Sequence, residues 1–135
     1  MQQFASFLPH GLKTNDLGDL GVIEFADLPF VPKRIYWIRD VGPSKSRGHH
    51  AHKKLRQYLV ALQGSVEINL KLGSEEISLE LQSDGNGLLL KTGVWRELRN
   101  FSSDAVLLVV CDQPYSEEDY IRNYEDYLEW FKNEI

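Results

Sequence analysis

Short apolar runs broken by turn residues make up most of the chain before residue 112. In the run Val66-Glu67-Ile68-Asn69-Leu70, apolar and polar side chains alternate, as in a strand with one buried and one wet face. Many such runs, separated by Gly, Pro, Asn, Asp and Ser, are typical of a β-sandwich or barrel. The pattern predicts strands at 21–25, 34–40, 49–53, 57–62, 66–71, 76–81, 87–91, 95–100 and 105–111.

The C-terminal tail changes to a helical period. Its apolar residues recur every three or four positions, which places them on one stripe of a helix. Ser116 and Asp119 have the spacing of a capping box, so we expect a helix over about 117–132. The chain is predicted to be a single domain of residues 1–135, all-β, with a jelly-roll barrel over about 12–112 and a C-terminal α-helix. The stripe consists of Tyr120, Ile121, Tyr124, Tyr127, Leu128 and Phe131.

Composition and charge exclude several classes of protein. A length of 135 residues suits one domain, and a net charge of −5 argues against non-specific nucleic-acid binding. No apolar run approaches the roughly 20 residues needed to cross a bilayer, so we expect no membrane partner. The one cysteine, Cys111, lies in an apolar run, so we expect it to be a core residue. A single cysteine cannot form an internal disulfide, which fits a reducing compartment. With no export signal at its start, the chain is expected to be cytoplasmic.

The most informative segment is Arg47-Gly48-His49-His50-Ala51-His52-Lys53. Residues two apart on a strand share a face, so His50 and His52 are expected to point into one interior and His49 away from it. Basic residues flank these histidines, and together they are candidates for holding a diphosphate on an otherwise acidic protein.

The spacing of this segment resembles a cupin barrel with altered ligands. The first cupin motif continues from its paired histidines to a glutamate, and this chain has Gln57 there; the second motif has a histidine where this chain has Arg96, followed by Asn100 in register. Gln is a weak ligand beside a carboxylate, and an arginine repels a divalent ion. We therefore predict a cupin without a metal and without any other cofactor.

Arg96 offers a substitute for the missing ion. A guanidinium stays protonated and stabilises developing negative charge through directed donors, while two neighbouring imidazoles exchange protons. This is equipment for abstracting a proton next to a carbonyl. Tyr36 shares a strand face with Arg34 and is a further candidate, although a core tyrosine fits the spacing equally well. A salt bridge of Arg96 with Glu97 or Asp104 is the structural alternative.

With these residues in place, the chain resembles the sugar-nucleotide 3,4-ketoisomerases. The similarity runs from about residue 12 to 131 and rests on the histidine segment above, on Pro32-Lys33-Arg34-Ile35-Tyr36, on Trp95-Arg96-Glu97-Leu98, and on Tyr120-Ile121-Arg122-Asn123-Tyr124. The resemblance implies an isomerase that converts dTDP-4-keto-6-deoxyglucose to its 3-keto isomer through an enediolate. It also implies a homodimer with exchanged N-terminal strands, and a pathway to 3-amino sugars of surface glycans such as the O-antigen of lipopolysaccharide.

The same resemblance implies roles for individual residues. It places the family's catalytic histidines at His50 and His52, its tyrosine at Tyr36 and its arginine at Arg96. From the convergence of His50, His52 and Arg96 we expect His50 to be the base at C3. The substrate-binding residues are expected to be Arg47, Lys53, Gln57 and Arg34, with Arg47 and Lys53 at the diphosphate. The chain departs from the family at Leu17, where relatives often carry a polar residue, and at Lys91, where proline is commoner. The stereochemistry at C4 of the product therefore stays open.

Three alternatives remain at this point. An epimerase of the same sugars also needs a histidine base and would leave the keto group at C4. A non-catalytic cupin would bind the sugar nucleotide without exchanging its C3 hydrogen. A metal-dependent cupin oxygenase would contain stoichiometric metal.

Overall fold

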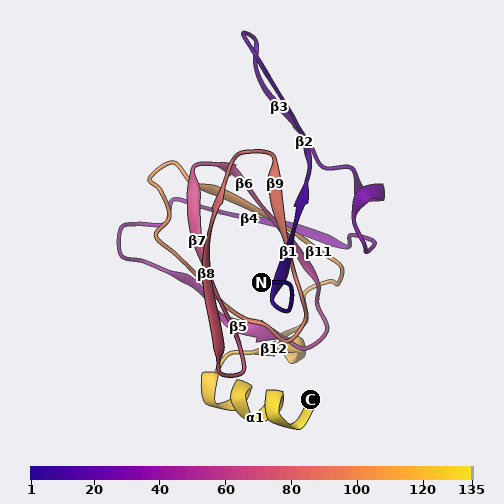
Figure 1. Cartoon of the computed structure of the whole chain (residues 1–135), viewed down its shortest axis with the longest axis vertical. Helices are drawn as coiled ribbons and strands as arrows, with labels where there is room; N and C mark the ends of the chain where they lie inside the picture. The colour runs from indigo at the N-terminus through magenta and orange to yellow at the C-terminus, as the bar shows by residue number, and fades with distance from the viewer. Residues whose placement is uncertain (135) are drawn as a thin grey trace.

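Two five-stranded sheets face each other in the computed structural model, which describes residues 1–134 (Figure 1). One sheet has the order β1-β9-β6-β11-β4 and the other β12-β5-β10-β7-β8, with every recorded pairing antiparallel. This confirms the predicted jelly-roll with a C-terminal helix. The first sheet comprises β1 (Ala5–Pro9), β9 (Asn86–Leu90), β6 (Gln57–Gln63), β11 (Val106–Cys111) and β4 (Arg34–Arg39). The second comprises β12 (Tyr120–Ile121), β5 (Arg47–His52), β10 (Trp95–Arg99), β7 (Ser65–Leu72) and β8 (Glu75–Gln82).

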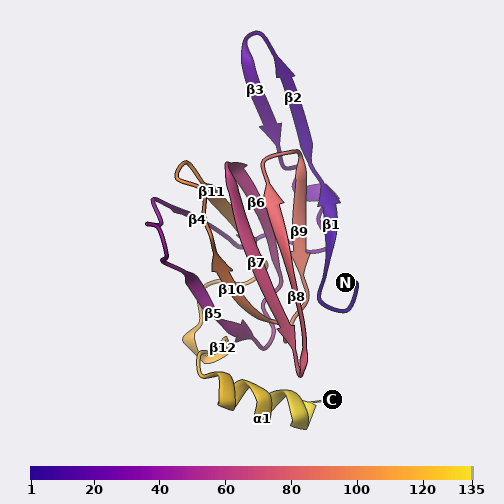
Figure 2. The same ribbon diagram turned by 60° about the vertical axis from the view of Figure 1, so that its left-hand side comes forward.

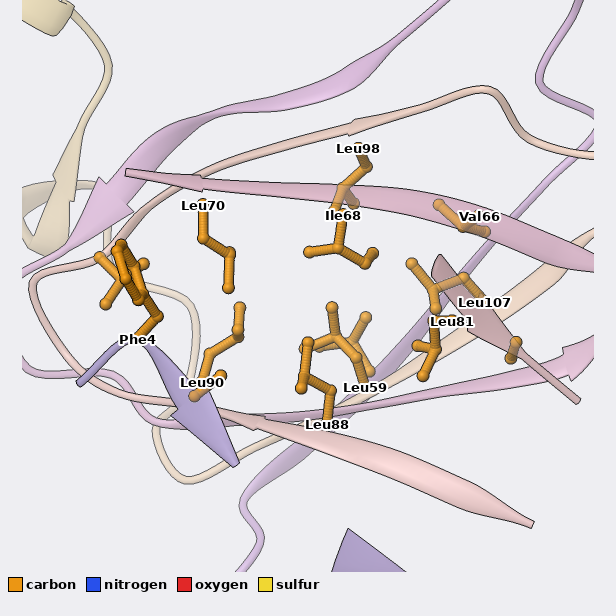
Figure 3. Packing of buried hydrophobic residues seen from close by; sticks show 14 of the residues in the cluster. Phe4, Leu59, Val66, Ile68, Leu70, Leu81, Leu88, Leu90, Leu98 and Leu107 are labelled. Atoms are coloured by element: carbon orange, nitrogen blue, oxygen red, sulfur yellow. The ribbon is translucent and has the colours of Figure 1, made fainter. Parts of the chain in front are cut away.

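The core lies between the sheets, where leucine and isoleucine side chains of both inner faces meet (Figure 3). Strand β7 follows its sequence pattern: Val66, Ile68 and Leu70 are fully buried and point toward the first sheet. Leu59 and Leu88 face them from β6 and β9. Burying such side chains contributes about 1.5–3 kcal/mol each, so this layer supplies much of the stability on which the site rests.

The N-terminal segment differs from the prediction. The first sheet begins at β1, with Phe4 and Ala5 in the core, rather than near residue 12. The predicted strand 21–25 was wrong: β3 (Gly18–Val22) ends at Val22, and a 3-10 turn, η1 (Phe25–Asp27), follows. β2 (Gly11–Asn15) and β3 pair only with each other and form a hairpin that projects from the barrel (Figures 1 and 2). All residues of both strands are exposed, so no burial imposes an apolar alternation.

The C-terminal helix also begins later than predicted. Residues expected to start it form a 3-10 turn, η2 (Glu117–Asp119), and then the short strand β12; α1 runs over Tyr124–Glu134. Ser116 makes no capping hydrogen bond, whereas Asn123 Oδ1 accepts one from the backbone N–H of Asp126 at 2.9 Å. The helix packs at the end of the barrel opposite the hairpin (Figure 2). No helix among residues 1–134 has the length and apolar character of a membrane span.

Candidate active site

A β-bulge in β5 aims the histidines. Gly48 and His49 have positive φ angles of 89° and 58°, and the register with β10 shifts between Arg96 and Glu97. A Cβ on Gly48 would approach the backbone oxygen of Arg96 to 3.0 Å, so glycine suits this position in both conformation and space. The extra residue turns His49 outward, where its ring bonds to Ser46 Oγ at 2.8 Å. Bulges next to active sites commonly re-aim a side chain in this way.

His50 and His52 meet inside the barrel end. Their ring centroids lie 4.8 Å apart in an edge-on arrangement, and the Tyr120 ring packs against both at 4.9 and 4.3 Å. His52 lines a cavity of about 270 Å³ and His50 a second of about 290 Å³. Arg34 and Tyr120 line both cavities, so the two form adjoining parts of one region.

Arg96 is a buried guanidinium that pairs with no carboxylate among the described residues 1–134. It is 2% exposed, and its donors reach Val94 O at 3.3 and 3.0 Å and Gln57 Oε1. Of the salt bridges within residues 1–134, none involves Arg96. The alternative salt bridge with Glu97 or Asp104 is therefore wrong: Glu97 pairs with Lys71, and Asp104 accepts a hydrogen bond from Ser102.

Gln57 connects this charge to Tyr36. Its Oε1 can only accept from the guanidinium, so its Nε2 is left to donate, and it does so to Tyr36 Oη at 3.1 Å. Tyr36 shares the inner face of β4 with Arg34, as predicted, and lines the same cavity as His50. Because its oxygen accepts from Gln57, the Tyr36 hydroxyl is free to donate its own proton into that cavity.

Burial of the site and the positive charge of Arg96 set the protonation states of its side chains. Burial, followed by the positive charge of Arg96, lowers the pKa of His50 to about 3 and that of His52 to about 2. Burial raises the pKa of Tyr36 and lowers the pKa of Arg96 to about 10. At neutral pH the site therefore holds two neutral imidazoles, a protonated phenol and a charged guanidinium.

Asp119 is a residue of the site that the sequence analysis missed. Its Oδ2 lies 3.0 Å from His52 Nδ1, and its Oδ1 accepts from the backbone N–H of Lys54 at 2.7 Å. We had interpreted it as half of a helix cap. No spacing signal could reveal the contact, because it joins positions 67 residues apart.

Arginines line the site more than lysines do. Arg34, Arg47 and Arg122 line the cavity that His50 lines, whereas Lys53 is exposed and is absent from the described lining of both cavities. Arg122 was not among the predicted residues. Its guanidinium lies 4.1 Å from the Tyr120 ring centroid and donates to Glu117 at 2.9 Å. An acidic protein thus has a locally basic cavity, which favours an anionic ligand.

The donor set does not fit the metal that many cupins hold. Within residues 1–134 there is no cluster of three or more His, Cys, Asp and Glu side chains suited to an ion. The two positions that would complete a cupin ligand set hold Gln57 and Arg96, and the guanidinium repels a cation beside the two rings.

Comparisons with known proteins agree with this geometry. The family model described as "FdtA: WxcM-like, C-terminal" matches residues 5–132. The TDP-4-oxo-6-deoxy-alpha-D-glucose-3,4-oxoisomerase of Aneurinibacillus thermoaerophilus is 40% identical over 111 residues, which are 82% of this chain and 80% of that protein. QdtA, a sugar 3,4-ketoisomerase from Thermoanaerobacterium thermosaccharolyticum solved with TDP, is 40% identical and superposes with a TM-score of 0.94 over 100% of this chain and 99% of its own.

Two further structures place these matches in context. A His-to-Asn mutant of QdtA was solved with TDP-4-keto-6-deoxyglucose; it is 40% identical over 98% of this chain and 97% of its own, with a TM-score of 0.93. A dTDP-4-dehydrorhamnose 3,5-epimerase from Bacillus anthracis covers 86% of this chain and 76% of its own at 14% identity and a TM-score of 0.73, so it shares the fold alone.

Proposed function

Because this chain belongs to the FdtA-like family of sugar-nucleotide 3,4-ketoisomerases, we propose that it converts dTDP-4-keto-6-deoxyglucose to its 3-keto isomer. The observation that carries the proposal is the buried, unpaired guanidinium of Arg96 beside two neutral imidazoles. Such a site stabilises the negative charge that develops on a substrate oxygen after a proton has been removed from the neighbouring carbon. The predicted ketoisomerase activity is favoured over the epimerase, whose solved example shares only the fold.

The first step of the reaction is removal of the C3 proton. His50 takes this proton, and the C–H electron pair forms the C3–C4 double bond while the C4 oxygen becomes anionic. A neutral imidazole is the form that accepts a proton, and the depressed pKa of His50 keeps it neutral at working pH. His50 then returns a proton to C4, which bonds to the electron pair of the C3–C4 double bond. The proton of the C3 hydroxyl passes to the C4 oxygen with the assistance of Tyr36, and the O–H electron pair forms the carbonyl at C3.

Arg96 and Tyr36 support the enediolate from different distances. Arg96 lies behind the cavity-lining side chains and acts through its field and through Gln57. Tyr36 lines the cavity, and its free hydroxyl proton serves an oxygen of the substrate. The Arg96–Gln57–Tyr36 chain therefore polarises the phenol toward donation, since hydrogen bonds in series reinforce one another.

The nucleotide diphosphate is assigned to the basic cavity. Arg47 and Arg34 line it and supply charge-assisted donors, and we add Arg122 to the predicted set. Lys53 does not line this cavity, so its contact with the diphosphate stays a prediction. Gln57 is 2% exposed, so its part in binding runs through the Tyr36 hydroxyl.

The assembly we propose is a homodimer with exchanged N-terminal strands. The β2–β3 hairpin is exposed in this chain, and the side chains of its Leu12, Leu17 and Leu20 are open to solvent. A cavity of about 430 Å³ lies between the hairpin and the outer side of the first sheet, where Ile35 is exposed. A second copy of the chain would cover these apolar surfaces. We further place the enzyme in the cytoplasm, in a pathway to amino sugars of surface glycans including O-antigen lipopolysaccharide.

The test is to incubate the protein with dTDP-4-keto-6-deoxyglucose and identify the product by NMR. We expect the carbonyl at C3 and, in deuterated water, label at C4 of the product and at C3 of recovered substrate. A carbonyl that remains at C4 with inverted neighbours would identify an epimerase instead. Binding of dTDP without hydrogen exchange would identify a non-catalytic cupin.

A further inference from the structure

The ring of His49 forms a bridge on the outer side of β5, away from the two cavities. Its Nε2 lies 2.8 Å from Ser46 Oγ, in the segment between β4 and β5, and its Nδ1 lies 3.9 Å from Glu97 Oε1 on β10. A carboxylate can only accept, so the ring turns its Nδ1–H toward Glu97, and Nε2 accepts from the Ser46 hydroxyl. The half-exposed ring is thus held from both sides, and we call these three side chains the His49 bridge.

The carboxylate at one end of the bridge is itself fixed. Glu97 Oε2 accepts from Trp95 Nε1 at 2.9 Å and lies 3.5 Å from Lys71 Nζ. Arg99 Nη1 lies 3.7 Å from the other carboxylate oxygen. The Glu97 side chain is only 16% exposed, so water screens these contacts less than those of a free surface pair. The ring of His49 therefore contacts a group that is held in place by two strands.

The backbone at His49 depends on such contacts. Across β5 and β10, His50 pairs with Arg96. The next pair joins Gly48 to Glu97, so His49 between them is left out of the ladder. Its φ of 58° lies in the left-handed region, which a residue with a Cβ adopts at a cost. The bridge opposes a return of this residue to the extended conformation, which would change the register with β10.

The same backbone carries the proposed base. His50 follows His49 directly, and its pairing partner Arg96 directly precedes Glu97. Nδ1 of His50 is buried and has no hydrogen-bond partner among residues 1–134. The direction of the His50 ring therefore depends on the backbone of β5 and on packing against the neighbouring rings of His52 and Tyr120.

We propose that His49 is a positioning residue that holds the bulge of β5 and thereby keeps His50 aimed into its cavity, an inference that rests on the proposed function. The His49 ring lines neither cavity at the site and acts through the backbone of the residue that follows it. A displacement of about 1 Å can cost an enzyme about 100-fold in rate, so a small shift of the bulge is enough to slow the reaction. Loss of the bridge should therefore affect kcat more than the affinity for the nucleotide.

The kinetic test is His49→Gly. Glycine adopts a positive φ readily, so this variant can keep the conformation of the bulge while it loses the ring. We expect kcat to fall about tenfold or more, while the Kd for dTDP in calorimetry stays within about threefold. Ser46→Ala removes the other half of the hydrogen bond and should lower kcat about fivefold. The double variant should be no slower than His49→Gly alone, because the two side chains act as one unit.

Ser44→Ala is the matched control for Ser46→Ala. Ser44 lies in the same segment and is exposed, and its hydroxyl donates to the backbone oxygen of Pro43 at 2.6 Å. The substitution makes the same chemical change two positions away and leaves the His49 bridge intact. We expect the kcat of this variant to equal that of the wild type.

A second measurement does not depend on turnover. Nitrogen-15 NMR of the histidine side chains in the unliganded protein reads the environment of each ring. The chain has four histidines, and the signals lost in His50→Asn identify the His50 ring. In the wild type we expect one sharp set of His50 signals. In His49→Gly these signals should broaden or split, because the ring is no longer held in one orientation, while those of His10 on the far side of the barrel stay unchanged.

The outcomes separate this inference from the proposed function. A folded His49→Gly protein with kcat within about twofold of wild type would overturn the inference, and so would unchanged His50 signals in that variant. If His49→Gly does not fold, Ser46→Ala decides, and a kcat equal to that of Ser44→Ala would overturn the inference. An equal loss in kcat and in dTDP affinity would show that His49 supports binding instead. Failure of the wild type to form the 3-keto sugar would refute the proposed function, and the NMR signals of His50 would still decide the role of His49.

Discussion

Gln57→Glu is the substitution that most selectively neutralises the positive charge of Arg96 in the site. It replaces one side-chain amide by a carboxylate of nearly the same shape and leaves Arg96 in place. The new carboxylate accepts from the guanidinium where Oε1 does now, and the positive charge acquires the partner that it lacks in the wild type. The Nε2 donor to Tyr36 is lost, so the phenol donates to residue 57 rather than into the cavity.

The expected loss follows from two estimates. A full opposite charge about 4 Å from the guanidinium offsets its field by about 4 kcal/mol at an effective dielectric constant of about 20. Removing one donor from an oxyanion site costs about 2.7–4 kcal/mol in other enzymes. Both estimates correspond to a fall in kcat of about 10²–10³-fold. Folding should survive, since a buried arginine gains an ion-pair partner.

The assay is a time course of 3-keto product by NMR at saturating substrate, with dTDP affinity measured by calorimetry. The control is Gln63→Glu, the same chemical change at the exposed far end of β6, for which we expect unchanged turnover. A folded Gln57→Glu protein that retains kcat within threefold of wild type would refute the claim that an uncompensated guanidinium drives the reaction.

Three further predictions follow from the same geometry. His50→Asn should bind dTDP normally but lose C3 hydrogen exchange and at least about 100-fold in kcat; normal exchange by mass spectrometry would remove His50 as the base. Arg47→Ala and Arg122→Ala should each raise the Kd for dTDP about tenfold in calorimetry and make this Kd less dependent on salt. Arg39→Ala, on the outer side of β4, should leave the Kd unchanged. Unchanged affinity in both site variants would contradict the assignment of the diphosphate to this cavity. The pKa of His50 is about 3 in the folded protein and 6.5 in the unfolded chain, so burial of the neutral ring costs no stability above pH 6.5. Below that pH, the free energy of unfolding should fall by up to about 1.4 kcal/mol per pH unit as the pH drops toward 3. Urea unfolding of His50→Gln should show a shallower dependence of this free energy on pH, and an equal dependence would refute the lowered pKa of His50.

A strand that alternates buried and exposed residues, such as β7, was predictable from the sequence, and the exposed β2–β3 hairpin was not. Strand β7 was predicted because Val66, Ile68 and Leu70 must be buried while their neighbours remain accessible to solvent. The β2–β3 hairpin buries nothing in this chain, so its residues carry no such constraint. The tail stripe was interpreted as one helix from about residue 117, but the backbone of Tyr120 and Ile121 pairs with β5 instead. Tertiary pairing there prevailed over the helical period.

The candidate site divides in the same way. His50 and His52 were predicted to share a face because strand geometry requires it. The spacing did not decide the surroundings of Arg96, since a salt bridge with Glu97 or Asp104 fitted the sequence equally well. Asp119 lies in the segment that crosses from β11 to β12, and Arg122 lies between β12 and α1. No local pattern places these segments beside β5. A carboxylate is recognised as a partner of His52 only when the fold places the two together.

The role of the buried guanidinium is tested by the kinetics of Arg96→Met, which removes the charge and keeps an apolar side chain of similar length in its place. We expect kcat to fall at least about 100-fold while the Kd for dTDP changes less than threefold, since the guanidinium stabilises charge that exists only during the reaction. Turnover within threefold of wild type, by a folded variant that binds dTDP, would contradict this role.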